Sequence, residues 1–146
     1  MKILVCDDMD FNLVAAKNQL EALGHEVVTE SNADKAIQKL TSTRYRSRDF
    51  DGDIVMTDLY FGTTAAGLAI ILMCIAKEIP VVMLTDADGH KDKLVTMLEE
   101  GINIKNVSLQ FATSQYGVGG ATLCAGFTEE GQLIKDWATA LEYSQL

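Results

Sequence analysis

Short apolar runs alternate with helical patterns along most of this 146-residue chain, and this alternation limits the folds open to it. The runs predict strands over residues 2–6, 26–30, 53–58 and 81–85, with a fifth strand somewhere in 104–112. Apolar residues at helical spacing predict helices over 11–23, 65–79 and 88–100, and another after Ser31, whose hydroxyl is a candidate cap. Strands that alternate with helices form parallel sheets covered on both faces, because right-handed crossovers leave few other arrangements.

The C-terminal part of the chain has a weaker pattern. Residues 113–128 are rich in glycine and small side chains and predict an irregular loop, whereas residues 129–143 have the apolar spacing of a helix. The length suits one domain. We therefore expect a single α/β domain over residues 1–146: a (βα)5 flavodoxin-like, doubly wound parallel sheet of five strands in the order 2-1-3-4-5.

Charge and cysteine content exclude several classes of protein. Twelve basic residues against 21 acidic ones give a net charge of −9, which would repel nucleic acid and anionic lipids, so we expect neither as a partner. Cys6, Cys74 and Cys124 lie in or near apolar runs, as reduced intracellular thiols do. The first apolar run ends at Asp7, too early for a signal peptide. These features predict a cytoplasmic protein.

Polar side chains follow three of the predicted strands. Asp7 and Asp8 come after the first strand, Asp58 after the third, and Thr85 ends the fourth. Each could have an ordinary structural role, since an acid after a strand often caps the next helix. The carboxyl ends of parallel strands nevertheless share one edge, so these groups should converge. Clustered carboxylates repel one another unless a cation neutralises them, and Mg²⁺ prefers such oxygen ligands. The sequence therefore predicts a magnesium site.

Five segments together resemble the receiver domain of two-component response regulators. They read DDMDFN (7–12), LGHEVV (23–28), IVMTDL (54–59), GL (67–68) and IPVVMLT (79–85). The resemblance extends over roughly residues 1–105, in order and at nearly the spacing of that family.

This resemblance implies a role for each residue of the predicted site. Asp58 would be the phosphoacceptor, and Asp7 and Asp8 would hold Mg²⁺ directly or through water, together with Asp58. The backbone carbonyl of Tyr60 would complete the metal's ligands, and Thr85 would donate a hydrogen bond to the phosphoryl group. A carboxylate nucleophile that forms an acyl phosphate beside Mg²⁺ is consistent with the chemistry of the residues themselves.

The function expected from the resemblance is that of a stand-alone receiver. It would accept the phosphoryl group from a histidine kinase or phosphotransfer protein and would signal by binding a downstream protein target. Such a protein is not an enzyme beyond its own phosphorylation, and a weak homodimer is a further option.

The sequence departs from the family most clearly at the fifth strand. The family ends that strand with Lys-Pro, the lysine pairing with the phosphoryl group, but this chain has no Lys-Pro and Ser108 takes the expected position. Asp86 replaces a small residue, and Lys105 falls where an aromatic residue is usual. Without a fixed cation we expect a weak switch, unless Lys91, Lys93 or Lys105 reaches the site.

Three alternatives remain open on sequence grounds. The missing lysine favours a pseudo-receiver that binds a partner without being phosphorylated. Asp8 and Asp10 match the short Asp-x-Asp pattern of haloacid dehalogenase-like phosphatases, but Asn12 stands where that family has Thr or Val. A flavodoxin would share the fold, yet Asp7 and Asp8 would repel the phosphate that its first loop must hold.

Overall fold

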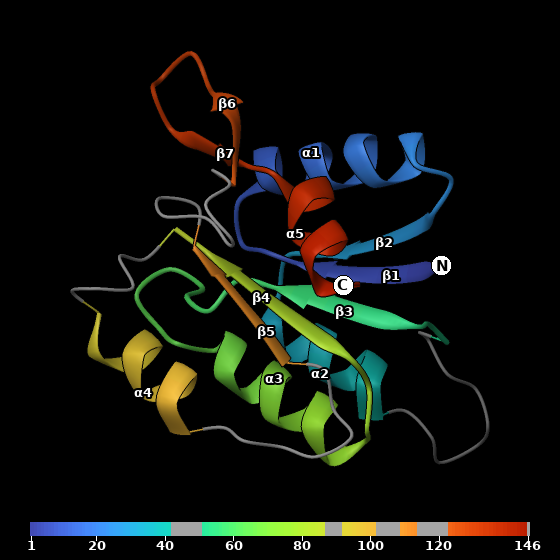
Figure 1. Ribbon diagram of the computed structural model, residues 1–146, viewed down its shortest axis with the longest axis vertical. Helices are drawn as coiled ribbons and strands as arrows, with labels where there is room; N and C mark the ends of the chain where they lie inside the picture. Colours follow the sequence, from blue (N-terminus) through green and yellow to red (C-terminus); the bar gives the residue numbers. More distant parts are fainter. Residues whose placement is uncertain (42–50, 87–91, 102–108, 114–122, 146) are drawn as a thin grey trace.

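The main sheet has the predicted topology. The computed structural model describes residues 1–41, 51–86, 92–101, 109–113 and 123–145. Its strands are β1 (Lys2–Cys6), β2 (Glu26–Glu30), β3 (Ile54–Thr57), β4 (Val81–Thr85) and β5 (Leu109–Thr113). They pair in parallel in the order β2-β1-β3-β4-β5, as Figure 1 shows. The predicted fold class is confirmed.

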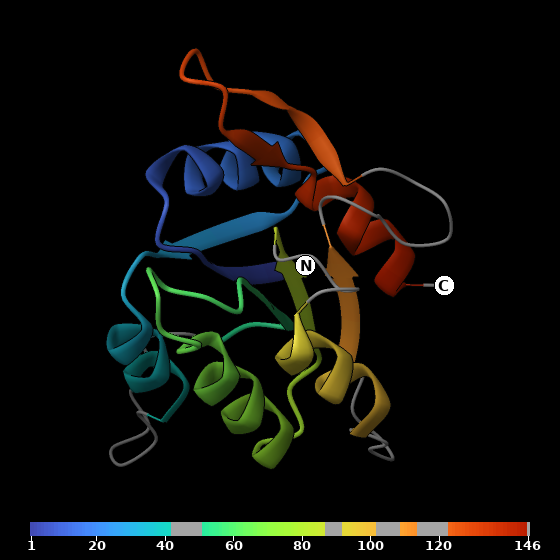
Figure 2. The ribbon, with the colours of Figure 1, turned by 90° about the vertical axis from the view of Figure 1, so that its left-hand side faces the viewer.

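Helices cover both faces of this sheet. They are α1 (Asp10–Ala22), α2 (Ala33–Thr41), α3 (Gly67–Ala76), α4 (Lys93–Gly101) and α5 (Trp137–Ser144). Figures 1 and 2 show α1 and α5 on one face and α2, α3 and α4 on the other. The cap of α2 differs from the prediction: the side chain of Asn32, not Ser31, accepts a hydrogen bond from the backbone N–H of Lys35 at 3.0 Å. An Asn at this position satisfies one of the free amides of the first turn.

Alternation along the central strands divides the core into two layers. In β1, Ile3 and Val5 pack toward α1 and α5, whereas Leu4 and Cys6 pack toward α2 and α3. All four side chains are fully buried. A strand buried on both faces must be apolar at every position, which explains why a continuous apolar run predicted its bounds correctly.

The segment before α5 is a β-hairpin rather than the start of a helix. β6 (Cys124–Phe127) pairs antiparallel with β7 (Leu133–Lys135), and Gly131 turns the chain with a φ of 83°. The helix predicted over 129–143 therefore begins only at Trp137, where the side chain of Asp136 accepts a hydrogen bond from Thr139 N at 3.0 Å. A short apolar run fits a strand as well as a helical turn, so periodicity alone misassigned it.

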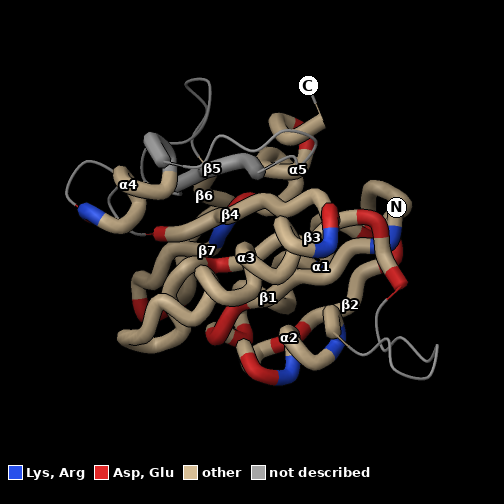
Figure 3. The backbone as a smooth tube through the Cα atoms, turned by 90° about the horizontal axis from the view of Figure 1, so that it is seen from below, with Lys and Arg blue, Asp and Glu red and all other residues tan. Residues whose placement is uncertain are grey.

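The helix α3 is unusually apolar. Figure 3 shows no charged residue along it, and Leu72 on its outer side is 52% exposed. Neither α3 nor any other helix in the described ranges has the length and apolar composition that a membrane span requires.

Close packing at Gly67 places the end of β3 against the start of α3. The N–H of Gly67 donates to the carbonyl oxygen of Leu59 at 2.9 Å. A Cβ at this position would overlap the backbone carbonyl oxygen of Asp58 and lie 2.8 Å from the Cα of Leu59. Only glycine fits here without a backbone shift, so this residue sets the position of the loop that follows β3.

We expect Gly67→Ala to destabilise the protein by about 2 kcal/mol, because the added methyl group must displace backbone rather than a flexible side chain. Leu72→Ala, which truncates an exposed side chain of the same helix, should cost less than about 0.5 kcal/mol. Urea unfolding of both variants measures the difference. Equal midpoints for Gly67→Ala and the unmodified protein would show that the loop tolerates the shift.

Candidate functional site

Three carboxylates meet at the edge where the parallel strands end. Oxygen atoms of Asp7, Asp8 and Asp58 lie within 4.8 Å of one another. The pairing of β1 with β3 produces this proximity, since the N–H of Asp58 donates to the carbonyl oxygen of Cys6 at 2.9 Å. The predicted convergence of these three residues is therefore present, and Asp7 and Asp58 are both buried.

Backbone amides hold each carboxylate in place. Asp7 Oδ1 accepts from the N–H of Met9 at 2.9 Å, and Asp58 Oδ1 accepts from the N–H of the next residue at 2.7 Å. Asp8 Oδ2 accepts from the N–H of Gly62 at 2.7 Å, which joins the loop after β1 to the loop after β3. These bonds restrict the rotation of each carboxylate.

A buried lysine lies between two of the carboxylates. Lys135 Nζ, at the end of β7, is 2.5 Å from Asp7 Oδ2 and 2.8 Å from Asp58 Oδ2, and its side chain is 1% exposed. The expectation that the site lacks a fixed cation is therefore wrong. The cation enters from the hairpin that precedes α5, not from the end of β5.

Of the candidate lysines named from the sequence, only Lys93 lies in the described part of the chain. Ser108, expected at the lysine's position, and the neighbouring Lys91 and Lys105 lie outside the described residues. Lys93 begins α4 and is exposed. A usable signal for Lys135 was its place directly before the capping Asp136 of the last helix, because the family's lysine also precedes that helix.

Burial and the neighbouring opposite charges act in opposite directions on the pKa of Asp7 and on the pKa of Lys135. Burial raises the pKa of Asp7, Lys135 opposes that rise, and the negative charge of Asp58 adds to it. For Lys135, burial alone would lower the pKa, but the two carboxylates outweigh it and the pKa lies above its usual value. The lysine is therefore held in its charged form. Its ammonium also lies 5.4 Å from the centre of the Trp137 ring, a cation–π contact.

A pocket of about 260 Å³ opens beside the acidic cluster. Asp8 and Asp58 line it together with Tyr60 and Asp86, so the residue that differs from the family's small one does lie at the site. Thr85 ends β4 and is fully buried. Asp58 thus lines the pocket and also pairs with the ammonium of Lys135. Carboxylate oxygens beside an ammonium can bind a cation and an anionic group together.

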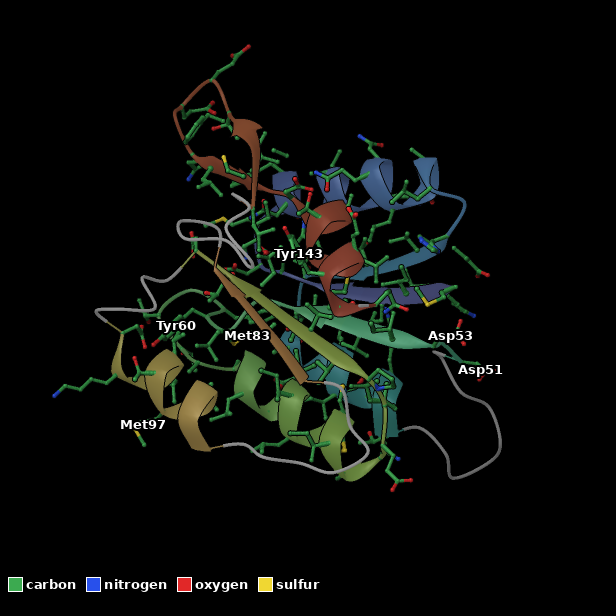
Figure 4. The ribbon with its side chains drawn as sticks, in the orientation of Figure 1. Asp51, Asp53, Tyr60, Met83, Met97 and Tyr143 are labelled. Atoms are coloured by element: carbon green, nitrogen blue, oxygen red, sulfur yellow. The ribbon has the colours of Figure 1, made fainter. Side chains whose placement is uncertain are left out.

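The loop that carries Tyr60 also contacts α4. Tyr60 Oη donates to Asp92 Oδ2 at 2.8 Å, and Asp92 Oδ1 accepts from the N–H of Leu94 at 2.9 Å and from that of Val95 at 3.1 Å. Figure 4 shows Tyr60 between the loop after β3 and the start of α4. The first turn of α4 is thus joined directly to a residue of the pocket.

Removing the lysine should leave two buried carboxylates facing each other. We expect Lys135→Met to destabilise the protein by about 3 kcal/mol in a chelating buffer. Lys93→Met, which removes an exposed lysine, should change stability by less than about 0.5 kcal/mol. Urea unfolding of both variants tests this. Similar midpoints for the two would mean that Lys135 does not neutralise the site.

We compared the sequence and the structure with those of known proteins. No family model matches the sequence, and no curated protein is significantly similar to it.

Solved structures do match. A response regulator receiver domain protein from Clostridium thermocellum is 20% identical with a TM-score of 0.58, over 98% of this chain and 92% of that chain. The bacteriophytochrome response regulator AtBRR is 27% identical with a TM-score of 0.58, over 78% and 81%. The response regulator TrrA from Thermotoga maritima, solved with Mg²⁺ and BeF, is 19% identical with a TM-score of 0.55, over 79% and 87%. The chain therefore has the fold of response regulator receiver domains.

Proposed function

We propose that this chain is a receiver domain that accepts a phosphoryl group on Asp58 and uses Lys135 as the fixed cation of the site. The observation that carries the proposal is the meeting of three carboxylates with one buried ammonium at the carboxyl edge of the sheet. That combination suits a metal ion and a phosphoryl group bound side by side. The Mg²⁺ and BeF in TrrA are consistent with it.

The residues fit a magnesium ion. Asp7, Asp8 and Asp58 offer oxygens near enough to share one cation, and Tyr60 lines the same pocket. In this proposal the backbone carbonyl of Tyr60 is a further ligand. Bound Mg²⁺ would offset the negative charge of the transferring phosphoryl group.

The proposed reaction is a phosphoryl transfer between a donor imidazole and a carboxylate. A carboxylate oxygen of Asp58 attacks phosphorus, the P–N bond of the donor phosphohistidine breaks, and its electron pair stays on the imidazole nitrogen. The product is an acyl phosphate on Asp58. Lys135, which contacts Asp58 Oδ2 at 2.8 Å, would then pair with the phosphoryl oxygens, and the hydroxyl of Thr85 would donate a hydrogen bond to them.

The position of Lys135 bears on the pseudo-receiver that the sequence left open, and the position of Asp10 bears on the phosphatase. The pseudo-receiver was favoured by a missing cation, and Lys135 removes that argument. The phosphatase requires Asp8 and Asp10 to act together, but Asp10 is exposed in the first turn of α1 and outside the cluster found in the described ranges. The expectation of a weak switch also loses its basis.

Several features remain predictions. The donor would be a histidine kinase or phosphotransfer protein, and the output would be binding to a downstream protein, with no catalytic turnover beyond the phosphorylation itself. The cytoplasmic location, the weak homodimer and the absence of nucleic-acid or membrane partners are predictions as well.

Phosphorylation should occur on Asp58 alone. Incubation with Mg²⁺ and acetyl phosphate should add the mass of one phosphoryl group to the intact protein. Asp58→Asn should abolish the addition because amide oxygen is a poor nucleophile. Asp10→Asn, at an exposed acid near the same edge, is the matched control and should still be modified. A mass gain that persists in Asp58→Asn would refute the assignment.

Millimolar Mg²⁺ should raise the melting temperature, because negative charge exceeds positive charge where three carboxylates face one ammonium. Asp8→Asn should remove most of that increment, since within the described structure Lys135 pairs with Asp7 and Asp58 but not with Asp8, whose charge is left for the ion. Thermal unfolding with and without Mg²⁺ measures the effect. An equal increment in both proteins would place the ion elsewhere.

A further inference from the structure

We propose that Asn12 and Gln19 of α1 are positioning residues that hold Lys135 at its two carboxylates. The inference rests on the proposed function, because it concerns how the cation of that site is placed. The inference goes beyond the proposed function because it assigns a role to two uncharged side chains. In the contacts described above, neither of them touches the carboxylate of Asp7 or Asp58.

The main sheet does not place this lysine. The strands β1 and β3, which carry Asp7 and Asp58 at their ends, are neighbours in the parallel sheet. Lys135 instead ends β7, which pairs with β6 in a separate two-stranded sheet within the described part of the chain. The ladder that aligns the carboxylates therefore does not extend to the lysine, and other contacts must set its position.

Asn12 supplies the first of these contacts. Its Oδ1 accepts a hydrogen bond from the backbone N–H of Lys135 at 3.0 Å, and its own backbone carbonyl accepts one from Trp137 Nε1 at 3.0 Å. Asn12 is 4% exposed and lies on α1 shortly after Asp7 and Asp8. One short stretch of chain thus carries the acid pair and one of the contacts that place the lysine.

Gln19 holds the other side of the same peptide segment. Its Nε2 donates to the carbonyl oxygen of Lys135 at 3.0 Å. Its Oε1 accepts from the N–H of Trp137 at 2.8 Å and from that of Ala138 at 3.1 Å. With Asn12 on the amide and Gln19 on the carbonyl, both polar backbone groups of Lys135 are bound to α1.

This attachment matters because a lysine ammonium is a point charge on a flexible stem. An ionic donor is useful at a phosphoryl group only if its distance and direction are fixed, and errors of about 1 Å are costly. Hydrogen bonds from side chains of one helix to the lysine backbone fix where that stem begins. Loss of either amide should leave the charge in the protein but place it poorly.

Trp137 gives a direct readout of the site. It is the single tryptophan of the chain, and its ring centre lies 5.4 Å from Lys135 Nζ. Titration of beryllofluoride at saturating Mg²⁺, followed by tryptophan fluorescence and confirmed by calorimetry, measures affinity for a phosphoryl mimic. Titration of Mg²⁺ alone measures the metal site separately.

The test compares Asn12→Leu and Gln19→Leu with Asn18→Leu, which changes an exposed amide of the same helix. We expect Lys135→Met to weaken beryllofluoride binding about tenfold or more, from the usual strength of a charged hydrogen bond. Asn12→Leu and Gln19→Leu should each weaken it several-fold without weakening Mg²⁺ binding, and Asn18→Leu should leave both affinities unchanged. Either amide variant suffices if the other fails to fold.

A double-mutant cycle separates positioning from a general structural effect. If the amides act through the lysine, Asn12→Leu should have no further effect on beryllofluoride affinity in a Lys135→Met background. An undiminished effect in that background, or unchanged affinity in both single amide variants, would overturn the inference. Failure of the unmodified protein to bind beryllofluoride with Mg²⁺ would instead overturn the proposed function, and this inference with it.

Discussion

A buried ammonium between two carboxylates is the interaction on which this structure depends. Lys135 is 1% exposed and lies within hydrogen-bond distance of Asp7 and Asp58. Removing charged groups from water is costly, and only close partners of opposite charge offset that cost. The ends of β1, β3 and β7 must therefore meet for any of the three groups to be tolerated. This requirement links the hairpin and α5 to the main sheet.

The same three charged groups suit the phosphoryl transfer that we propose. Charges that are already in place when the phosphoryl group arrives need little reorganisation, which is the main electrostatic advantage of a folded site over water. Here the parallel sheet aligns the acids, and α1 carries the amides that hold the backbone of Lys135. Tyr60 and Asp92 in turn join the pocket to the first turn of α4, so a change at the site has a direct contact through which to reach a surface helix.

The parts that the sequence predicted well are those governed by local patterns. Strands buried on both faces are nearly continuously apolar, so β1 and β4 were placed with their correct bounds. The acids that follow β1 and β3 had to share one edge. The lysine was missed because it was sought just beyond Gly101, whereas β5 begins at Leu109 and Lys135 is the last residue of a separate hairpin. Its pairing depends on contacts with α1 that are distant in sequence. Spacing along the chain could not predict them.

The most direct test of the central claim is a crystal structure of the protein with Mg²⁺ and beryllofluoride. The account predicts beryllium bound to a carboxylate oxygen of Asp58 and Lys135 Nζ within about 3 Å of a fluorine atom, as expected for a charged hydrogen bond. The backbone of Lys135 should keep its hydrogen bonds to Asn12 and Gln19. A structure in which the mimic is bound at Asp58 while Lys135 points away, or in which another cation takes its place, would contradict the account.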